Sequence, residues 1–108
     1  MQVLKETLRM FPAGANVTRR VAPEAMELGG YAIPKGVMIS TPAYVLHHMP
    51  ENFPQPESFS PERFLDGADA AAQNKRAFIP FSYGARDCPG QRLAMMQVTM
   101  CCHPGPAT

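Results

Sequence analysis

The stretch that decides the fold is FIPFSYGARDCPGQRLA, residues 78–94. It places a single cysteine, Cys88, in a glycine-bounded loop directly before a segment with helical periodicity. A cysteine at a helix N-terminus meets backbone N–H groups without partners and the positive end of the helix dipole, and both favour the thiolate. Arg86 adds positive charge two residues earlier. The loop therefore suits a metal centre that takes one thiolate from the protein.

Three further residues of this loop fit such a centre. Gly84 and Gly90 allow backbone geometries that other residues avoid and let a flat ligand approach the main chain, while Phe81 supplies an aromatic wall that keeps water from the sulfur. Zinc is disfavoured because no second Cys or His lies at ligand spacing. A structural cysteine in a turn is the alternative. Against it stands the whole pattern Phe-x-x-Gly-x-Arg-x-Cys-x-Gly, which occurs by chance roughly once in three million start positions.

The composition is that of a loop-rich chain. The 108 residues include 12 Pro and 8 Gly, about 19% together against a usual share of about 12%, which argues against a helical bundle and a doubly wound sheet. A net charge of +1 offers no basic surface for nucleic acid. No apolar run is long enough for a membrane segment. The odd number of cysteines, 3, disfavours a disulfide scaffold.

Periodicity and turn residues predict a modest set of elements. Residues 1–10 carry a helical pattern that Pro12 ends, and residues 91–102 carry a second one. Gly29-Gly30 predicts a two-residue hairpin turn between strands at Met26–Leu28 and Tyr31–Ile33. The other expectations are extended stretches at Asn16–Val21 and Val37–Ser40, a helical turn within 42–48, an irregular connector at 50–61 and a surface loop at Asp66–Lys75.

Residues 78–94 resemble the haem-binding loop of the haem-thiolate monooxygenases, the cytochrome P450 superfamily. Lys5-Glu6-Thr7-Leu8-Arg9 resembles the family's Glu-x-x-Arg helix, and FSPERF at 59–64 resembles its Pro-Glu-Arg-Phe segment. The residues at 29–36 resemble its connecting hairpin. All of these segments follow one another in the family's order. The resemblance implies the cytochrome P450 fold, which is mainly α with a small β-sheet.

Within that fold we expect a loop-rich C-terminal part rather than a complete domain. Residues 1–100 correspond to the C-terminal portion of the family's domain, and residues 101–108 form a divergent or truncated tail. Nothing in the sequence resembles the long central helix that handles oxygen and protons in the family. We therefore expect the isolated chain to be inactive and unable to enclose haem. A non-catalytic haem-binding fragment and an unfolded remnant are the alternative interpretations.

The resemblance implies a haem-dependent monooxygenase in which Cys88 is the axial thiolate ligand of haem b, iron protoporphyrin IX. It further implies that Glu6, Arg9 and Arg63 form a buried charge triad under the haem. Taken alone, Glu6 and Arg9 are an ordinary surface pair worth about 0.2–0.5 kcal/mol. The residues implied to bind or support the cofactor are Phe81, Gly84, Arg86, Gly90, Arg20, Glu6, Arg9 and Arg63.

Several of these assignments have competitors. Arg86 corresponds to a haem-propionate ligand, with a solvated loop arginine as the alternative, and Arg19 competes with Arg20 for a second propionate. His47 stands where the family has His-Arg-Asp-Pro, but the string here is His-His-Met-Pro, so a propionate contact and a solvated histidine are both open. Asp87 places a negative charge beside the thiolate, which disfavours the anion.

The implied partners are an electron-donor reductase or ferredoxin and a small apolar organic substrate, with no nucleic acid. The small residues at 13–17 correspond to a substrate-facing stretch, with a plain loop as the alternative. A basic set is expected to dock the acidic redox partner: Lys75, Arg76, Arg86 and Arg92. A metal site at Cys101, Cys102 and His103 is disfavoured because adjacent cysteines point apart on a helix. The parent enzyme is expected at the endoplasmic reticulum membrane, with its anchor outside this chain.

Overall fold

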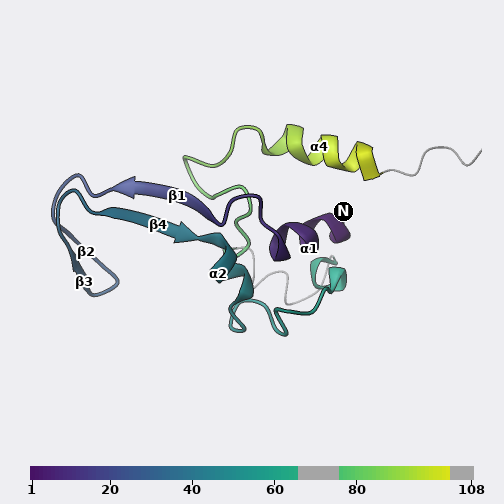
Figure 1. Cartoon of the computed structure of the whole chain (residues 1–108), viewed down its shortest axis with the longest axis horizontal. Helices are drawn as coiled ribbons and strands as arrows, with labels where there is room; N and C mark the ends of the chain where they lie inside the picture. The colour runs from purple at the N-terminus through teal and green to yellow at the C-terminus, as the bar shows by residue number, and fades with distance from the viewer. Residues whose placement is uncertain (66–75, 103–108) are drawn as a thin grey trace, which may run out of the picture.

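A computed structural model describes residues 1–65 and 76–102 of the chain (Figure 1). The model contains short helices and two small antiparallel pairs of strands. In chain order the elements are helix α1 (Gln2–Met10), strands β1 (Asn16–Val21), β2 (Met26–Leu28), β3 (Tyr31–Ile33) and β4 (Met38–Pro42), helix α2 (Ala43–His48), the 3-10 helix η1 (Pro61–Phe64) and helix α4 (Gln91–Cys102).

The strands form an arm that extends away from the helices (Figure 1). β1 runs antiparallel to β4, from Val21 opposite Met38 at the far end to Asn16 opposite Pro42 near α2. β2 and β3 form a hairpin at the tip of the arm. Its two turn residues have positive φ angles, +60° at Gly29 and +84° in the next glycine, which is the backbone conformation that glycine adopts without strain.

The body of the molecule is built where α1, α2, η1 and the connector between the last two meet. Its buried apolar side chains are few, and the fully buried ones are Ala43 and Phe53. Three polar side chains, those of Glu6, Arg9 and His47, are buried to the same extent. Buried polar groups are costly unless they are hydrogen-bonded, so this body depends on how well those three are paired.

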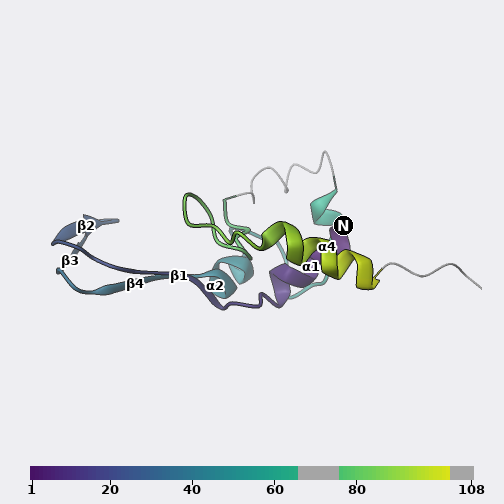
Figure 2. The same ribbon diagram turned by 90° about the horizontal axis from the view of Figure 1, so that it is seen from above.

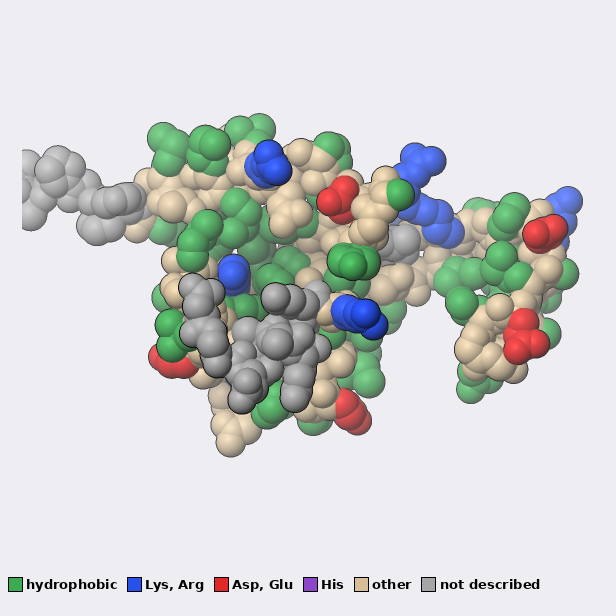
Figure 3. Space-filling view, turned by 180° about the vertical axis from the view of Figure 1, so that it is seen from behind, with side chains coloured by type: hydrophobic (Ala, Val, Ile, Leu, Met, Phe, Trp, Pro, Cys, Tyr) green, Lys and Arg blue, Asp and Glu red, His purple; other side chains and the backbone are tan. Residues whose placement is uncertain are grey.

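Helix α4 lies over α1 and carries no buried residue (Figures 1 and 2). Its apolar side chains at Leu93, Met96 and Met100 are 60%, 60% and 71% exposed. The space-filling view from behind shows hydrophobic side chains along α4 and in the hollow beneath it (Figure 3). The radius of gyration is 16.7 Å, against about 13 Å for a compact domain of this length. None of the helices described is long and apolar enough to cross a membrane.

The expected elements agree well with the structure. Both helices, the extended stretch at 16–21 and the hairpin at 26–33 are confirmed. The strand expected at 37–40 runs from Met38 to Pro42 instead, because its pairing with β1 continues to Asn16. The connector at 50–61 is irregular, as expected, but η1 follows it unforeseen, with Pro61 at the first turn of the helix. The surface loop expected at 66–75 lies outside the described residues.

Candidate functional site

The loop that carries Cys88 is closed by its own backbone. The Ser82 N–H donates to the Ile79 carbonyl at 3.1 Å, and the Cys88 N–H donates to the Phe81 carbonyl at 2.9 Å. The chain reverses direction at Ser82 and Gly84, where φ is +70° and +90°. The positive angle at Gly84 explains a glycine there, since other residues rarely adopt it. The loop is thus a fixed turn that sets the position of its cysteine.

Cys88 presents its thiol on an open face of this turn. The side chain is exposed, and the Cys88 carbonyl accepts a hydrogen bond from the Gln91 N–H at 3.2 Å, at the start of α4. A Cβ atom added at Gly90 would lie 3.8 Å from the Cys88 sulfur, in ordinary van der Waals contact with it. Glycine therefore leaves the flank open to a broad ligand.

The donor set of this loop is one sulfur. No group of three His, Cys, Asp or Glu side chains that could hold a metal ion occurs among the described residues. A metal bound at Cys88 would therefore bring its other ligands with it, as an iron held by a porphyrin does. The single accessible thiol and the open flank at Gly90 fit that kind of cofactor.

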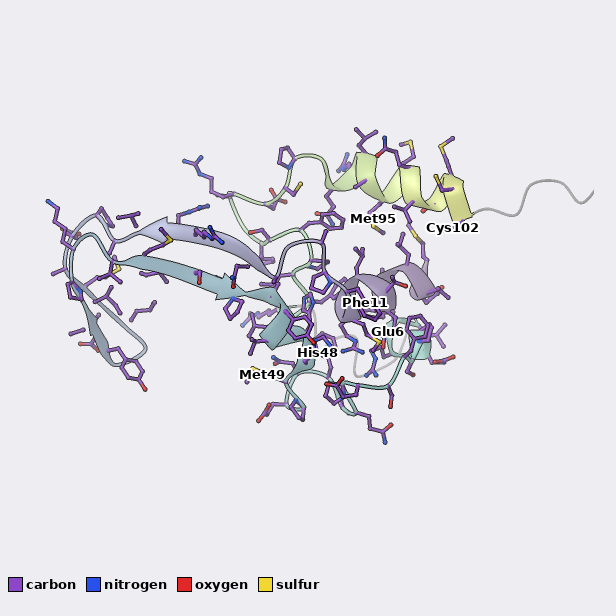
Figure 4. The ribbon with its side chains drawn as sticks, in the orientation of Figure 1. Glu6, Phe11, His48, Met49, Met95 and Cys102 are labelled. Carbon is purple, nitrogen blue, oxygen red and sulfur yellow. The ribbon has the colours of Figure 1, made fainter. Side chains whose placement is uncertain are left out.

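The shielding expected of Phe81 is not present in the described part of the chain. Phe81 is half-buried and lines a cleft of about 460 Å³ with Leu8 of α1 and Gln91 of α4, whereas Cys88 is exposed. Met95 points from α4 toward α1 in the same cleft (Figure 4). The sequence showed an aromatic residue near the cysteine, but it could not show that this residue lines a cleft with residues of α1.

A second set of residues lies beneath this loop, at the centre of the body. Glu6 binds Arg9 through two hydrogen bonds of 2.9 Å, one from Nε to Oε2 and one from Nη2 to Oε1. Arg63 of η1 donates from Nε to Glu6 Oε1 at 3.1 Å, and the Ser60 N–H donates to the same oxygen at 3.0 Å. The structure therefore brings together all three residues that the family resemblance placed in a charge triad. Glu6 lies between α1 and η1 (Figure 4).

The two arginines of this charge cluster also order the chain around it. Arg9 donates to the His47 carbonyl at 2.9 Å, and its guanidinium carbon lies 5.5 Å from the centre of the Phe53 ring. Arg63 donates to the carbonyls of Pro54 and Ser58 at 3.1 and 3.2 Å. Among the described residues, no buried side-chain nitrogen or oxygen lacks a hydrogen-bond partner. The cluster thus fixes the irregular connector that precedes η1.

Pairing decides the ionisation of Glu6. Burial acts to raise the pKa of this carboxyl group, because a buried charge is poorly solvated. The hydrogen bonds from Arg9 and from the Ser60 N–H, with the charges of Arg9 and Arg63, outweigh burial and hold the pKa below its usual value. Glu6 is therefore a carboxylate, and the cluster is a paired set of charges with one surplus positive charge.

The structure corrects the sequence interpretation of His47. Its side chain is fully buried, Nε2 accepts the Ile79 N–H at 3.0 Å, and Nδ1 lies 3.1 Å from the Arg9 carbonyl. The two sequence interpretations, a propionate contact and a solvated histidine, are therefore both wrong, because both ring nitrogens bind backbone groups. Burial lowers the pKa of His47 to about 4, the hydrogen bond to the Arg9 carbonyl opposes that shift, and the Arg9 charge adds to it.

Comparisons with known proteins agree with this arrangement. Residues 1–104 match the family described as cytochrome P450. The chain belongs to that family. It is 42% identical over 98 residues to cytochrome P450 3A2 of Rattus norvegicus and 44% identical over 96 residues to probable cytochrome P450 4s3 of Drosophila melanogaster. These matches cover 91% and 89% of the chain, so nearly all residues of the chain align with cytochrome P450 proteins.

The chain spans about a fifth of the length of these relatives, since each match covers 19% of the relative. Cytochrome P450 3A19 of Capra hircus aegagrus is 40% identical over 98 residues, which cover 44% of that protein. Membership in the cytochrome P450 family implies a haem cofactor, and the single thiol of Cys88 fits it. It also identifies the small sheets and few helices as part of a cytochrome P450 fold.

The remaining sequence predictions fall on the surface of this cytochrome P450 segment. Arg86 is exposed in the Cys88 loop. Arg20 is exposed on β1, where its Nη1 donates to the Arg19 carbonyl at 2.8 Å, and its competitor Arg19 is exposed as well. A contact of either arginine with a haem propionate stays a prediction. Exposed positions also include Arg76, Arg92, Cys101 and Cys102, whereas Lys75 and His103 lie outside the described residues.

Proposed function

We propose that this chain provides the haem-binding part of a haem-dependent monooxygenase, with Cys88 as the axial thiolate ligand of haem b. One observation carries the proposal: an exposed thiol on a backbone-closed turn, with glycine at the position flanking the sulfur. A structural cysteine would be buried in its turn, and this one is not. Family membership supplies the kind of cofactor that the thiol would meet.

Each residue of the site then has a separate task. Bound haem would supply the redox chemistry, in which one oxygen atom of O₂ enters an organic substrate and the thiolate ligand donates electron density to the iron. Cys88 would hold the iron, Gly84 and Gly90 would let the macrocycle approach the backbone, and Arg86 would pair with a propionate. Glu6, Arg9 and Arg63 keep the underlying body folded, so they support binding without touching reacting atoms.

The partners follow from the same assignment. A monooxygenase needs two electrons for each turnover, so we infer a reductase or ferredoxin as electron donor and a small apolar organic molecule as substrate. Arg76, Arg86 and Arg92 are exposed around the Cys88 loop and α4, where positive charge would attract an acidic donor. Reversing the charge at Arg92 should slow electron transfer more at low salt than at high salt, and equal slowing at both would contradict this docking surface.

One observation favours a second function, that of a haem-binding fragment without catalysis. Cys88 is exposed, so water reaches this residue in the chain without a cofactor. Thiolate ligands need a dry pocket to survive reduction of the iron. In this second function the 108-residue chain binds ferric haem through Cys88 but does not oxidise a substrate.

The test is a titration of the purified chain with ferric haem b, followed by absorption spectroscopy. We expect a saturable thiolate-type spectrum that is lost in Cys88→Ala. The matched control is the double variant Cys101→Ala/Cys102→Ala, because those two cysteines are exposed as well and lie on α4. The control should bind haem like the unsubstituted chain. Equal spectra for all three proteins would show that Cys88 is not the ligand.

Reduction and carbon monoxide then separate the two functions. If the chain is a non-catalytic fragment, the reduced carbon monoxide complex should lack the thiolate-type Soret band. If that band forms and disappears in Cys88→Ala, the chain keeps its thiolate on reduced iron by itself, and the argument from solvent exposure for the non-catalytic function fails. Far-UV circular dichroism of the same samples identifies an unfolded chain, which would contradict both functions.

A further inference from the structure

His47 connects the charge cluster to the Cys88 loop. Arg9 and His47 bind each other twice, since the Arg9 guanidinium donates to the His47 carbonyl at 2.9 Å and His47 Nδ1 lies 3.1 Å from the Arg9 carbonyl. On its other side the ring accepts the Ile79 N–H through Nε2 at 3.0 Å. One buried side chain therefore joins α1, the end of α2 and the segment that leads into the loop.

The partners of this ring select one chemical form. Ile79 offers an N–H, so Nε2 must be without a proton in order to accept it. Arg9 offers a carbonyl, so Nδ1 must carry the proton and donate it. Only neutral histidine with its proton on Nδ1 satisfies both neighbours. Two aromatic rings pack against the His47 ring. The Phe78 ring is stacked on it with 5.5 Å between ring centroids, and the Phe53 ring meets it edge-on with 6.1 Å between centroids.

The hydrogen bonds continue from Ile79 to the cysteine. Ile79 is 6% exposed, and its carbonyl accepts the Ser82 N–H at 3.1 Å. Two residues further along, the Phe81 carbonyl accepts the Cys88 N–H at 2.9 Å. The position of Ile79 thus fixes the base of the turn that holds Cys88. The N–H that anchors this base to the body of the molecule is the one that His47 accepts.

We propose that His47 is a positioning residue, whose Nε2 sets the place of the Cys88 loop by accepting the Ile79 N–H. The cofactor role of that loop rests on the proposed function, whereas the link itself does not. His47 touches neither cofactor nor substrate; it acts through Ile79. The link also gives the charge cluster a second task, because Arg9 orients the ring that orients the loop.

Two substitutions separate the two ring nitrogens. In His47→Gln the longer amide places an oxygen near Nε2, where it can accept the Ile79 N–H. In His47→Asn the shorter amide reaches only the place of Nδ1, where it can donate to the Arg9 carbonyl. The measurement is amide hydrogen exchange of the 108-residue chain without haem, followed at the N–H groups of Ile79, Ser82 and Cys88. The matched control is His48→Gln, one residue along α2.

We expect exchange at these three amides to become about tenfold faster in His47→Asn and to stay within about twofold in His47→Gln and His48→Gln. The Ala22 amide, which donates to Val37 in the arm at 2.9 Å, should not change and serves as the internal reference. Equal acceleration in both His47 variants would overturn the proposal. So would a rise that includes Ala22, or a loop without protection in the unsubstituted chain, because either would make the effect global or the link absent.

Haem binding gives the second readout. His47→Asn should weaken the Cys88-dependent ferric spectrum, and His47→Gln should restore it. If Cys88→Ala binds haem like the unsubstituted chain, the proposed function fails, and the exchange experiment still decides the role of His47. If Cys88→Ala loses haem while all His47 variants keep both the spectrum and the loop exchange, the positioning role fails and the proposed function stands.

Discussion

The charge cluster and the Cys88 loop differ in how completely this chain surrounds them. Glu6 and Arg9 are fully buried, and every buried side-chain polar atom in the described chain has a partner. Cys88 is exposed, and so are most apolar side chains of the helix that follows it. The cluster meets its hydrogen-bonding needs internally. The loop leaves its thiol exposed, as the proposed ligand of a haem iron would be before the cofactor binds.

This difference assigns stability to one region and binding to the other. A buried set of charges is costly to leave incomplete, so its residues are constrained by folding. An exposed thiol contributes little to the free energy of folding. Folding therefore does not explain why a cysteine occupies this closed turn, and ligand binding is the explanation that we propose. The predictions below test whether substitutions in the two regions separate in this way.

The largest effect is expected for Glu6→Ala. The substitution leaves Arg9 and Arg63 buried without their carboxylate, which costs about 3–5 kcal/mol of the free energy of unfolding. Since a domain has only about 5–15 kcal/mol in total, this loss removes a large share of the stability of the chain. Urea titration followed by far-UV circular dichroism measures this. Glu27→Ala, at an exposed site on β2, is the control and should change the value by less than about 0.5 kcal/mol. Similar losses for both variants would contradict a special role for the cluster.

The next effect is a pH dependence caused by His47. Its pKa in the folded chain is about 4, against 6.5 ordinarily, so the unfolded chain binds the proton more readily between these values. Stability is therefore complete above about pH 6.5 and falls as the pH is lowered toward 4. We expect a loss of about 2 kcal/mol from about pH 7 to about pH 4.5, measured by urea titration. Below its usual pKa of 4.5, Glu6 adds a loss of the same sign.

His47→Gln provides the comparison for that experiment. Glutamine does not titrate, so the loss between about pH 7 and about pH 4.5 should shrink to what the other groups of the chain contribute. The His48→Gln control should keep most of the pH dependence, because the charge of His48 is the smallest of the named causes of the shift. If His47→Gln is as sensitive to pH as the unsubstituted chain, His47 is not the group that titrates.

The sequence was sufficient to predict most local structure. The glycine pair at 29–30 identified the hairpin, because the turn needs two positive φ angles. The spacing of apolar residues identified α1 and α4. It also put Glu6 and Arg9 on one helix face, but only the family resemblance added Arg63, which lies 57 residues from Glu6 in the chain. Side-chain pairing over that distance leaves no periodic signal.

His47 could not be predicted for the same reason. A histidine beside another histidine, before Met49-Pro50, looks like part of a polar loop. Its burial results from contacts with Arg9 and Ile79, which lie 38 and 32 residues away from it in the chain. The exposure of Cys88 was missed because Phe81 stands close to it in sequence, whereas Phe81 lines the cleft beside α1. For His47, the one feature that the sequence offered was its place at the end of a short predicted helical turn, and that feature alone does not indicate burial.

A smaller effect is expected for Arg63→Lys. Lysine keeps the charge, but it cannot contact Glu6 while also donating to the carbonyls of Pro54 and Ser58, as the arginine fork does. We expect a loss of about 1 kcal/mol in the free energy of unfolding. Arg92→Lys, at an exposed site on α4, is the matched control and should be neutral. A neutral Arg63→Lys would mean that charge alone, without hydrogen-bond geometry, holds η1 in place.

The smallest effects are expected on α4. Leu93 and Met96 are each 60% exposed, so replacing either with Gln removes little buried apolar surface and should change the free energy of unfolding by less than about 0.5 kcal/mol. Phe53→Ala, at a fully buried site, should cost about 3–5 kcal/mol by comparison. Urea titration of the three variants gives both values in one assay. If the α4 variants proved as destabilising as Phe53→Ala, the helix would be part of the folded body in solution. The division between an enclosed cluster and an outward-facing Cys88 region would then be wrong, because the thiol would sit in a region that folding itself requires.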